Sequence, residues 1–450
     1  MKNGIRIVAG LVLLVIPLLI PVGEGHDRAA AAEKWVARYN GPGNGDDSAS
    51  AIAVDGSGNI YVTGTSKGAG ADNDFATVKY DSNGKQLWAK SYDGPGRGDD
   101  KATGIAVDGS GYVYVLGESK GSGTGSDITT IKYSANGKQL WVKRYNGPAN
   151  RDDVAGGLAV DGSGNVYVAG ANMDSSVGPY FKTIKYSSKG SMLWAKAYSD
   201  PTKRFGCSFG IALDGSGNAH AAGWVKVGAH NDFGAVKYDA SGNQLWAKRY
   251  SGAGDFNDCA QAIAVDSSGN VYIAGYSSVS GFKKDWATLK YGPAGNQLWV
   301  KRYDGPLKGN DCPEAIAADG SGNTYVTGWS EGLNTGIDYT TIKYNPNGKQ
   351  LWAKRYNAYG NCSDAAKALV VDGSGNVYIT GYSGSQDAGT DFATIMYNPA
   401  GKQLCVIRYN GPGNLDDRAK AIAIDKSGNI YVAGESTGSG TGYDFATIKY

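Results

Sequence analysis

The segment VDGSGNVYVAG at residues 160–170 decides the fold, because close copies of it recur along the whole chain. Its aspartate returns at positions 55, 108, 161, 214, 266, 319, 372 and 425, which gives a period of 53 residues with a single step of 52. Self-similarity at this period is typical of repeat proteins, in which each unit buries its apolar surface against its neighbours. The sequence therefore predicts a shape before it predicts any chemistry.

Each repeat contains four short stretches with the composition of β-strands, which in the first repeat are 49–54, 59–64, 74–80 and 86–92. They are rich in Val, Ile, Tyr, Thr and Trp, and clusters of Gly, Asn, Asp and Ser separate them. We expect the repeated Asp to cap its own turn. Four strands in each of eight units predict an all-β chain, a single eight-bladed β-propeller of four-stranded blades.

The two ends of the chain indicate how the ring closes. Tyr450 ends the third strand of the eighth unit, and the segment Trp35–Tyr39 matches the fourth-strand pattern at 140–145. We therefore expect Trp35–Tyr39 to complete the last blade, so that no long sheet edge stays open. The propeller domain is predicted to span 33–450.

Residues 1–32 differ in kind from the repeats. Lys2 and Arg6 precede an apolar run from Ile7 to Val22, and small residues follow at 29–32. This pattern predicts a secretory signal peptide, with an uncleaved membrane anchor as the alternative. We expect an exported protein, periplasmic, extracellular or on the cell surface, with no membrane span in its mature chain.

Three segments, 164–170, 347–356 and 444–450, resemble SBBP repeats, a bacterial β-propeller family. The resemblance implies a secreted or cell-surface propeller and brings no catalytic motif with it. The family name implies seven blades, and the eight predicted here depart from it. A more distant similarity is to the tryptophan-docked repeats of quinoprotein propellers, in which Gly precedes Trp by four positions, as Gly84 precedes Trp88.

The net charge and the scarcity of catalytic residue types exclude several classes of function. A formal net charge of +2 over 450 residues gives no electrostatic reason to expect nucleic acid as a partner. Beyond residue 32 the histidines are His220 and His230, no two cysteines are adjacent as a quinoprotein would require, and no serine-nucleophile motif is present. We expect a monomeric, non-enzymatic protein without a cofactor. The alternative is a quinoprotein-like or hydrolytic enzyme at the mouth of the channel, using His220 or an Asp.

Four cysteines fall in consecutive repeats. Cys207, Cys259 and Cys312 each stand seven residues before the turn Asp, and Cys362 lies three residues earlier in its repeat. Neighbouring blades could bring such positions to about 7 Å, at the limit for a disulfide. Disulfides and free thiols therefore stay equal alternatives. Cys405 takes the place of the repeated Trp, and we expect a buried, inert thiol there.

Two series of aspartates recur on the side of the longer, variable loops. The first stands eight residues before the turn Asp, at Asp47, Asp100, Asp153, Asp258, Asp311, Asp364 and Asp417. The second opens the third strand, at Asp74, Asp127, Asp232, Asp285, Asp338, Asp391 and Asp444. Arginine ends the fourth strand at Arg38, Arg144, Arg249, Arg302, Arg355 and Arg408. We predict an Asp-Arg-Asp cluster in each blade. A ring of Ca²⁺ sites is the alternative.

The residue after the glycine that ends the second strand differs around the ring. In order it is Thr65, Glu118, Ala171, Trp224, Tyr276, Trp329, Tyr382 and Glu435. Four consecutive repeats thus carry an aromatic residue, and they are the four that carry the loop cysteines. Aromatic rings at this position suit a carbohydrate or peptide partner, whereas packing between blades is the alternative. We expect a binding or scaffolding module for a protein or glycan that uses Trp224, Tyr276, Trp329 and Tyr382.

Overall fold

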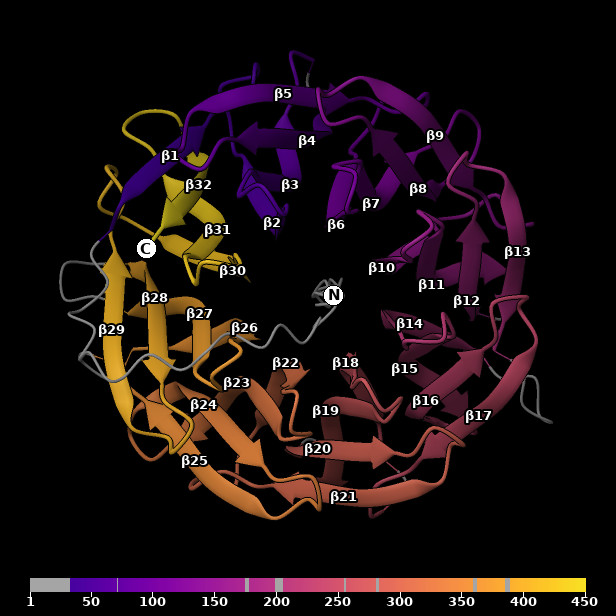
Figure 1. The fold of residues 1–450 in the computed structure, drawn as a ribbon, viewed down its shortest axis with the longest axis vertical. Coiled ribbons are helices and arrows are strands. Elements are labelled where there is room, and N and C mark those ends of the chain that lie inside the picture. Colours follow the sequence, from indigo (N-terminus) through magenta and orange to yellow (C-terminus); the bar gives the residue numbers. More distant parts are fainter. Residues whose placement is uncertain are drawn as a thin grey trace.

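A computed structural model describes residues 33–450 except 71, 175–177, 199–204, 255, 281–282, 359–361 and 385–388. The predicted signal peptide therefore lies outside the described residues. Within them, 32 strands form eight antiparallel four-stranded sheets arranged as a ring, which confirms the eight-bladed β-propeller (Figure 1). The part of the chain so described has no helix that is long and apolar enough to cross a membrane.

The strands occupy four positions in each blade, from the axis of the ring outward (Figure 1). The innermost strands are β2 Ser48–Val54, β6 Lys101–Val107, β10 Val154–Val160, β14 Gly206–Leu213, β18 Asp258–Val265, β22 Asp311–Ala318, β26 Ala365–Val371 and β30 Asp417–Ile424. The second strands are β3 Ile60–Lys67, β7 Val113–Lys120, β11 Val166–Asp174, β15 Ala219–Val227, β19 Val271–Ser280, β23 Thr324–Gly332, β27 Val377–Gly384 and β31 Ile430–Thr437. The third strands are β4 Asn73–Tyr80, β8 Ser126–Tyr133, β12 Gly178–Tyr186, β16 His230–Tyr238, β20 Lys283–Tyr291, β24 Gly336–Tyr344, β28 Thr390–Tyr397 and β32 Tyr443–Lys449. The outer strands are β5 Gln86–Tyr92, β9 Gln139–Tyr145, β13 Met192–Ala197, β17 Gln244–Tyr250, β21 Gln297–Tyr303, β25 Gln350–Tyr356, β29 Gln403–Tyr409 and β1 Trp35–Tyr39.

Strand β1 closes the ring as the sequence predicts. It pairs antiparallel with β32, with Trp35 opposite Lys449 and Tyr39 opposite Phe445. The last blade therefore has the order β1-β32-β31-β30 and contains the N-terminal strand as its outer strand. Figure 1 shows the indigo β1 beside the yellow β32. The edge of β32 is covered, which removes a template for pairing with another chain.

The recurrent tryptophan of the outer strand joins a blade to the next in every blade but the seventh along the chain. Trp88 donates its Nε1–H to the carbonyl oxygen of Ala135, in the hairpin turn between the third and fourth strands of the following blade, at 3.1 Å. Gly137 in that turn has φ +79°, and a Cβ there would lie 2.9 Å from the Trp88 ring. Glycine is therefore required both for the turn and for the close approach of the ring.

We number the blades in chain order, from blade 1 (β2 to β5) to blade 8 (β30 to β32 with β1). In blade 7, Cys405 replaces the tryptophan, and the way the ring closes explains why. The hairpin that would receive a ring from blade 7 is interrupted in blade 8, where β32 and β1 come from opposite ends of the chain. Cys405 instead lies half-buried against an apolar cluster that includes Met396 and Tyr450. Among residues 33–450, no hairpin turn joins β32 to β1 that could receive a tryptophan from blade 7.

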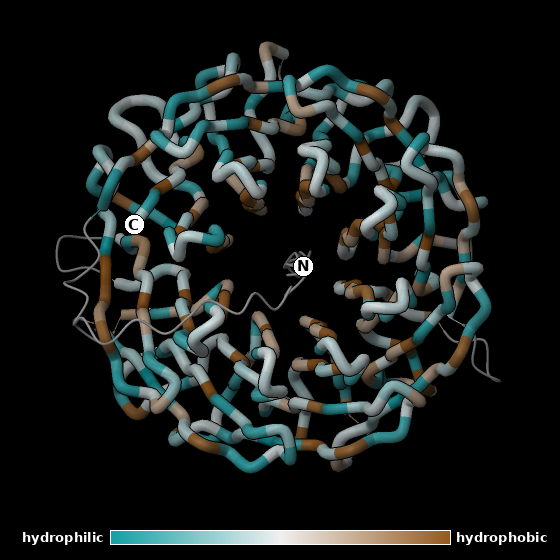
Figure 2. The backbone as a smooth tube through the Cα atoms, viewed as in Figure 1, coloured by the Kyte–Doolittle hydropathy of each residue, from teal (hydrophilic) through white to brown (hydrophobic). Residues whose placement is uncertain are grey.

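The repeated Asp caps its turn, as expected. Oδ1 of Asp55 accepts hydrogen bonds from the N–H groups of Ser57 and Asn59, and Oδ2 accepts from the Asn59 amide and the Tyr61 hydroxyl. These turns lie at the opposite end of the blades from the longer loops. Hydrophobic stretches recur along the blades around the ring (Figure 2), and the apolar clusters join adjacent blades. The fold thus positions one variable face, here named the long-loop face, where the first strand begins and the second ends.

Candidate functional site

The four aromatic residues and three of the four loop cysteines lie on the two innermost strands, at their ends on the long-loop face. Three pairs are direct cross-strand partners: Cys207 with Trp224, Cys259 with Tyr276, and Cys312 with Trp329. Tyr382 faces Ala365. The coincidence of the two series in the sequence is therefore a physical contact. We call the four blades that carry them the aromatic half of the rim.

The equivalent pairs in blades 8, 1 and 2 are polar, which makes the rim two-sided. They are Arg418 with Glu435, Ser48 with Thr65, and Lys101 with Glu118. In blade 8, Glu435 also forms ion pairs with Lys420 at 2.5 Å and with Arg418 at 3.5 Å. One side of the rim is therefore charged and the other aromatic.

All four aromatic rings are half-buried, so each keeps part of its surface in solvent. Trp224 and Tyr276 pack against the cluster formed by Cys207 and Cys259. The Nζ of Lys284 stands over the Tyr276 ring, 4.1 Å from its centroid. Each ring is therefore held in place from one side, which suits a rigid contact surface.

The structure adds a set of residues to this rim that sequence reasoning missed. Every innermost strand contains a β-bulge, at which one residue has no partner on the second strand. The bulged residues are Ser50, Thr103, Gly156, Phe209, Gln261, Glu314, Lys367 and Lys420. Bulges redirect side chains and are frequent beside functional sites. The sequence did contain a signal for these residues. The bulged position changes its chemical type from blade to blade, whereas the rest of the innermost strand is nearly uniform.

Two bulged residues form a buried ion pair beside the aromatic rings. Lys367 Nζ lies 2.6 Å from Glu314 Oε1, with side-chain exposures of 18% and 7%. The same Oε1 accepts a hydrogen bond from Trp329 Nε1 at 3.3 Å, and Lys367 Nζ lies 5.8 Å from the centroid of the Tyr382 ring. Burial opposes the charge of Lys367, but the Glu314 carboxylate outweighs it and raises the pKa of the lysine. This pair ties blade 6 to blade 7.

The five cysteines, all of which lie in described segments, form no disulfide with one another. Burial raises the pKa of Cys207, Cys259 and Cys312, so these thiols are protonated at neutral pH. The choice between disulfides and free thiols that the sequence left open is therefore still to be tested chemically. Cys362 lies outside the strands, where its Cβ approaches Gly384.

The first series of aspartates holds the long loops in place. Asp47 accepts hydrogen bonds from the N–H of Gly41 at 2.6 Å and of Lys67 at 2.8 Å, and therefore joins the loop before β2 to the end of β3. The equivalent loop residue donates to Asp100, Asp153, Asp258, Asp311, Asp364 and Asp417. Burial is the main reason that the pKa of Asp153 and that of Asp311 are raised to about 6. Hydrogen bonds from backbone N–H groups therefore give each of these carboxylates a structural role.

The second series of aspartates pairs with the arginines, as the hairpin register predicts. Arg144 lies opposite Thr129, and its Nη2 reaches Asp127 diagonally at 2.9 Å. The other pairs are Arg38 with Asp444, Arg249 with Asp232, Arg302 with Asp285, Arg355 with Asp338, and Arg408 with Asp391.

The predicted Asp-Arg-Asp cluster needs one correction. Arg144 does not bind the first acid of its blade. Its Nη1 donates instead to the hydroxyl of Ser119 on the second strand, at 2.6 Å. Burial raises the pKa of the first acid, Asp100, and the Ser119 hydroxyl opposes this rise in part. A serine therefore stands between the arginine and the first acid.

Blade 3 and its junction with blade 4 lack all three charged groups, and two aromatic residues meet there. Tyr180 and Phe205 contact edge to face with their ring centroids 5.4 Å apart. This contact gives a physical reason for the joint loss of the charged residues at Tyr180, Ala197 and Gly206.

His220, on which the enzyme alternative relied, lies at the other end of the second strand from the rim. It replaces the tyrosine that binds the turn Asp in other blades, is 0% exposed, and places Nε2 3.1 Å from Asp214 Oδ2. Lys237 binds the same oxygen at 3.0 Å. Burial lowers the pKa of His220. His220 is therefore part of the packing within blade 4, where its ring centroid also lies 5.8 Å from that of Trp246.

Among the described residues, two groups of three carboxylates bring oxygens within 4.8 Å of one another and could hold a metal ion. One contains Asp74, Asp93 and Asp100, and the other contains Asp285, Asp304 and Asp311. Each group joins the second acid of one blade to the first acid of the next. They are therefore different combinations from the ring of first acids that the sequence suggested.

Comparison with known proteins identifies the repeats. The beta-propeller repeat family SBBP matches residues 34–70, 94–123, 246–283 and 407–440. No curated protein sequence matches the chain. Similar solved structures include a gluconolactonase from Xanthomonas campestris, at 13% identity over 72% of this chain and 90% of that chain, with a TM-score of 0.35. They also include a eukaryotic initiation factor, at 10% identity over 82% and 89% with a TM-score of 0.41, and a polysaccharide lyase, at 12% identity over 90% and 89% with a TM-score of 0.47.

Proposed function

Because the chain is an eight-bladed ring that carries SBBP β-propeller repeats, we propose that it is a non-enzymatic binding module whose contact surface is the aromatic half of the rim. Its partner is a protein or a carbohydrate. The surface consists of Trp224, Tyr276, Trp329 and Tyr382 with the adjoining pair Glu314–Lys367.

One observation carries this proposal. A blade forms equally well with Thr65, Glu118 or Ala171 at the position that holds Trp224 in blade 4. Blade packing therefore does not require an aromatic ring there. Four consecutive blades nevertheless carry a half-buried ring with part of its surface in solvent. Contact with a partner is the role that accounts for these rings.

The chemistry of the surface fits both kinds of partner. Tryptophan and tyrosine supply large, rigid contact area at low cost in conformational entropy, and both stack on sugar rings and anchor peptides. The carboxylate of Glu314 and the ammonium of Lys367 stand beside the rings and offer an acceptor and a donor for orientation. Such a mixture of apolar area and a few fixed polar groups is typical of a recognition site.

The test is a screen of residues 33–450 against glycan and peptide arrays, repeated with the double variant W224A/W329A. The proposal expects binding by the wild type and its loss in the variant, with unchanged circular dichroism. The matched control is L87A/L140A, which removes two side chains of outer strands that are 47% and 44% exposed. Equal binding by all three proteins would exclude the aromatic half as the contact surface.

We also propose that the protein acts outside the cytoplasm, after removal of residues 1–32. The proposal rests on the order of charged, apolar and small residues in that segment. N-terminal sequencing of the protein recovered from the medium or the cell envelope tests it. A chain that begins at Met1 in the cytoplasm would contradict it.

A further inference from the structure

Blade 1 lacks the arginine that neutralises the second acid in six other blades. Its position is taken by Ser91, which lies opposite Ala76 as Arg144 lies opposite Thr129. The Ser91 hydroxyl donates to Asp74 Oδ2 at 3.1 Å. Asp74 therefore has a neutral hydroxyl where the corresponding aspartates have a guanidinium.

A buried hydroxyl faces the place of the missing guanidinium. In five blades, arginine Nη1 donates to a serine Oγ of the second strand, at distances of 2.6–2.8 Å, and Nη2 donates to the carbonyl oxygen of the same serine. The serine of blade 1 is Ser66. It is 2% exposed, and its Oγ, which no arginine of the described residues reaches, lies beside the Asp47 carboxylate and the Tyr39 hydroxyl without a well-aligned hydrogen bond to either. A buried polar group that lacks a well-aligned hydrogen bond is costly, and a bound ion or water would satisfy it.

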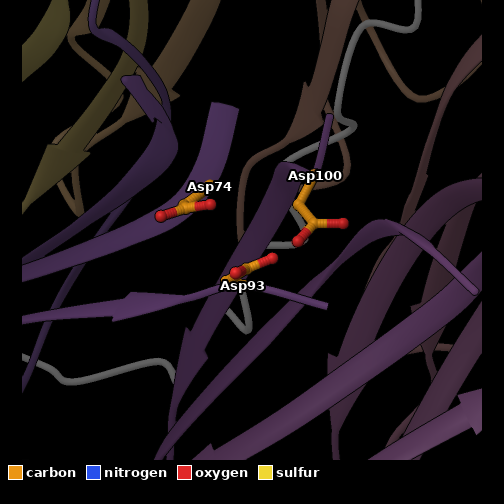
Figure 3. Close-up of side chains that lie close together, drawn as sticks. All are labelled: Asp74, Asp93 and Asp100. Carbon is orange, nitrogen blue, oxygen red and sulfur yellow. The ribbon is translucent and has the colours of Figure 1, made fainter. Parts of the chain in front are cut away.

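The charge around this place is negative. Asp93, in the connection after β5, and Asp100, just before β6, bring carboxylate oxygens within 4.8 Å of Asp74 (Figure 3).

Blade 5 provides the comparison within the same chain. Asp285, Asp304 and Asp311 form the equivalent group of three carboxylates. There Arg302 binds Asp285 at 3.0 Å and donates to the Ser277 hydroxyl at 2.8 Å. The two junctions differ in that blade 5 has its arginine and blade 1 does not.

We propose that blade 1 binds a calcium ion between Ser66 and Asp74, in the place that an arginine guanidinium takes in the other blades. The donors are the Asp74 carboxylate, the Ser66 hydroxyl and the Ser66 carbonyl oxygen, completed by water. Asp93 and Asp100 supply further negative charge. Ca²⁺ suits this place because it accepts six to eight oxygen ligands in flexible geometry, and because two positive charges match several carboxylates better than one. The ion would join the second and third strands of blade 1 beside its connection to blade 2, independently of any partner at the rim.

The test is isothermal titration of CaCl₂ into residues 33–450 that have been stripped with EDTA. The wild type is expected to bind one ion. The variant S91R restores the guanidinium and is expected to bind none, whereas R302S recreates the gap in blade 5 and is expected to bind two. S66A is expected to weaken binding at least tenfold. The melting temperature of the wild type should rise with Ca²⁺ and that of S91R should not, because a ligand of the folded state stabilises it by mass action.

Several outcomes would overturn the proposal. They are no binding by the wild type, an unchanged stoichiometry in folded S91R, or stabilisation by NaCl that CaCl₂ does not exceed. If S91R does not fold, D74N decides instead: loss of the ion supports the site, and retention excludes it. If R302S is folded and gains no ion, the missing arginine is not what creates the site, and the proposal fails.

Discussion

The guanidinium of Arg38 lies 2.8 Å from the carboxylate of Asp444, although 406 residues separate the two in the sequence. The same guanidinium donates to the hydroxyl and to the carbonyl oxygen of Ser436. Where the same Arg–Asp–Ser contact occurs in other blades, it lies within one continuous segment of chain. Here it joins β1, at the start of the ring, to β31 and β32 at its end. Closure of the ring therefore uses the same chemistry as the interior of a blade.

We expect R38A to destabilise the ring by about 1.5–3 kcal/mol, because it removes charge-assisted hydrogen bonds and leaves Asp444 buried without its partner. The matched control is R249A, whose side chain is 42% exposed against 23% for Arg38 and whose pair with Asp232 is longer, at 3.2 Å. Urea unfolding monitored by tryptophan fluorescence gives both values. Equal losses in the free energy of unfolding for R38A and R249A would show that the closing contact stabilises the ring no more than the more exposed pair does.

Gly137→Ala is expected to cost about 2 kcal/mol or more, since the residue has φ +79° and its new Cβ would meet the Trp88 ring at 2.9 Å. Gly162→Ala serves as the control, because a Cβ there has no atom within 4 Å. Thermal unfolding of the two variants compares them directly. A similar melting temperature for both would contradict the docking of Trp88 on the turn of the next blade.

The stability that His220 contributes should fall as the pH drops below about 6.5, the ordinary pKa of histidine. Asp153 and Asp311, whose pKa values are raised to about 6, act in the opposite direction, so the prediction concerns the difference between variants at His220. Burial lowers the pKa of His220 in the fold, against the hydrogen bond to Asp214 and with the help of nearby Lys237. The unfolded chain therefore binds a proton that the folded chain does not, and acid favours unfolding.

His220→Tyr should reduce this loss, because a tyrosine hydroxyl binds the turn Asp in other blades, as Tyr61 binds Asp55 at 2.9 Å. The measurement is the free energy of unfolding between pH 7.5 and 5.5. His230→Gln is the control and should keep the wild-type dependence on pH. The same slope in H220Y as in the wild type would assign the loss to other groups.

Cys207 and Cys259 should react with a thiol reagent at pH 8 at least tenfold more slowly in the folded chain than in urea. Burial raises the pKa of both thiols, and the thiolate is the reactive form. The reaction is followed by the absorbance of a chromogenic thiol reagent. The single variants C207A and C259A show which cysteine accounts for the slow phase of the reaction. A disulfide between these residues in the mass spectrum of the exported protein would contradict the thiol form.

Much of this architecture could be predicted from the sequence because each step depends on spacing. The period gave the blades, the match of Trp35–Tyr39 to a fourth strand gave the closure, and the hairpin register placed Arg144 near Asp127. Spacing alone could not show which neighbour lies between two charged groups. For that reason Ser119 was missed as the residue that separates Arg144 from Asp100.

The rim was harder to predict, because a bulge breaks the alternation on which strand reasoning depends. Glu314 and Lys367 each occupy the extra position of an innermost strand, so a regular register does not place them beside Trp329 and Tyr382. His220 was misplaced for another reason. Its closeness to Trp224 in sequence hid the fact that four residues of a strand span the distance from the rim to the turn face.

The measurement that tests the proposed function most directly is ¹⁹F NMR of the chain labelled with 5-fluorotryptophan, with a glycan or peptide from the screen added to saturation. The ten tryptophans can be assigned by single Trp→Phe variants. The account predicts that the resonances of Trp224 and Trp329 shift, while those of the blade-packing residues Trp88 and Trp141 stay in place. Saturation of the ligand with Trp224 and Trp329 unmoved would contradict the aromatic half of the rim as the binding surface.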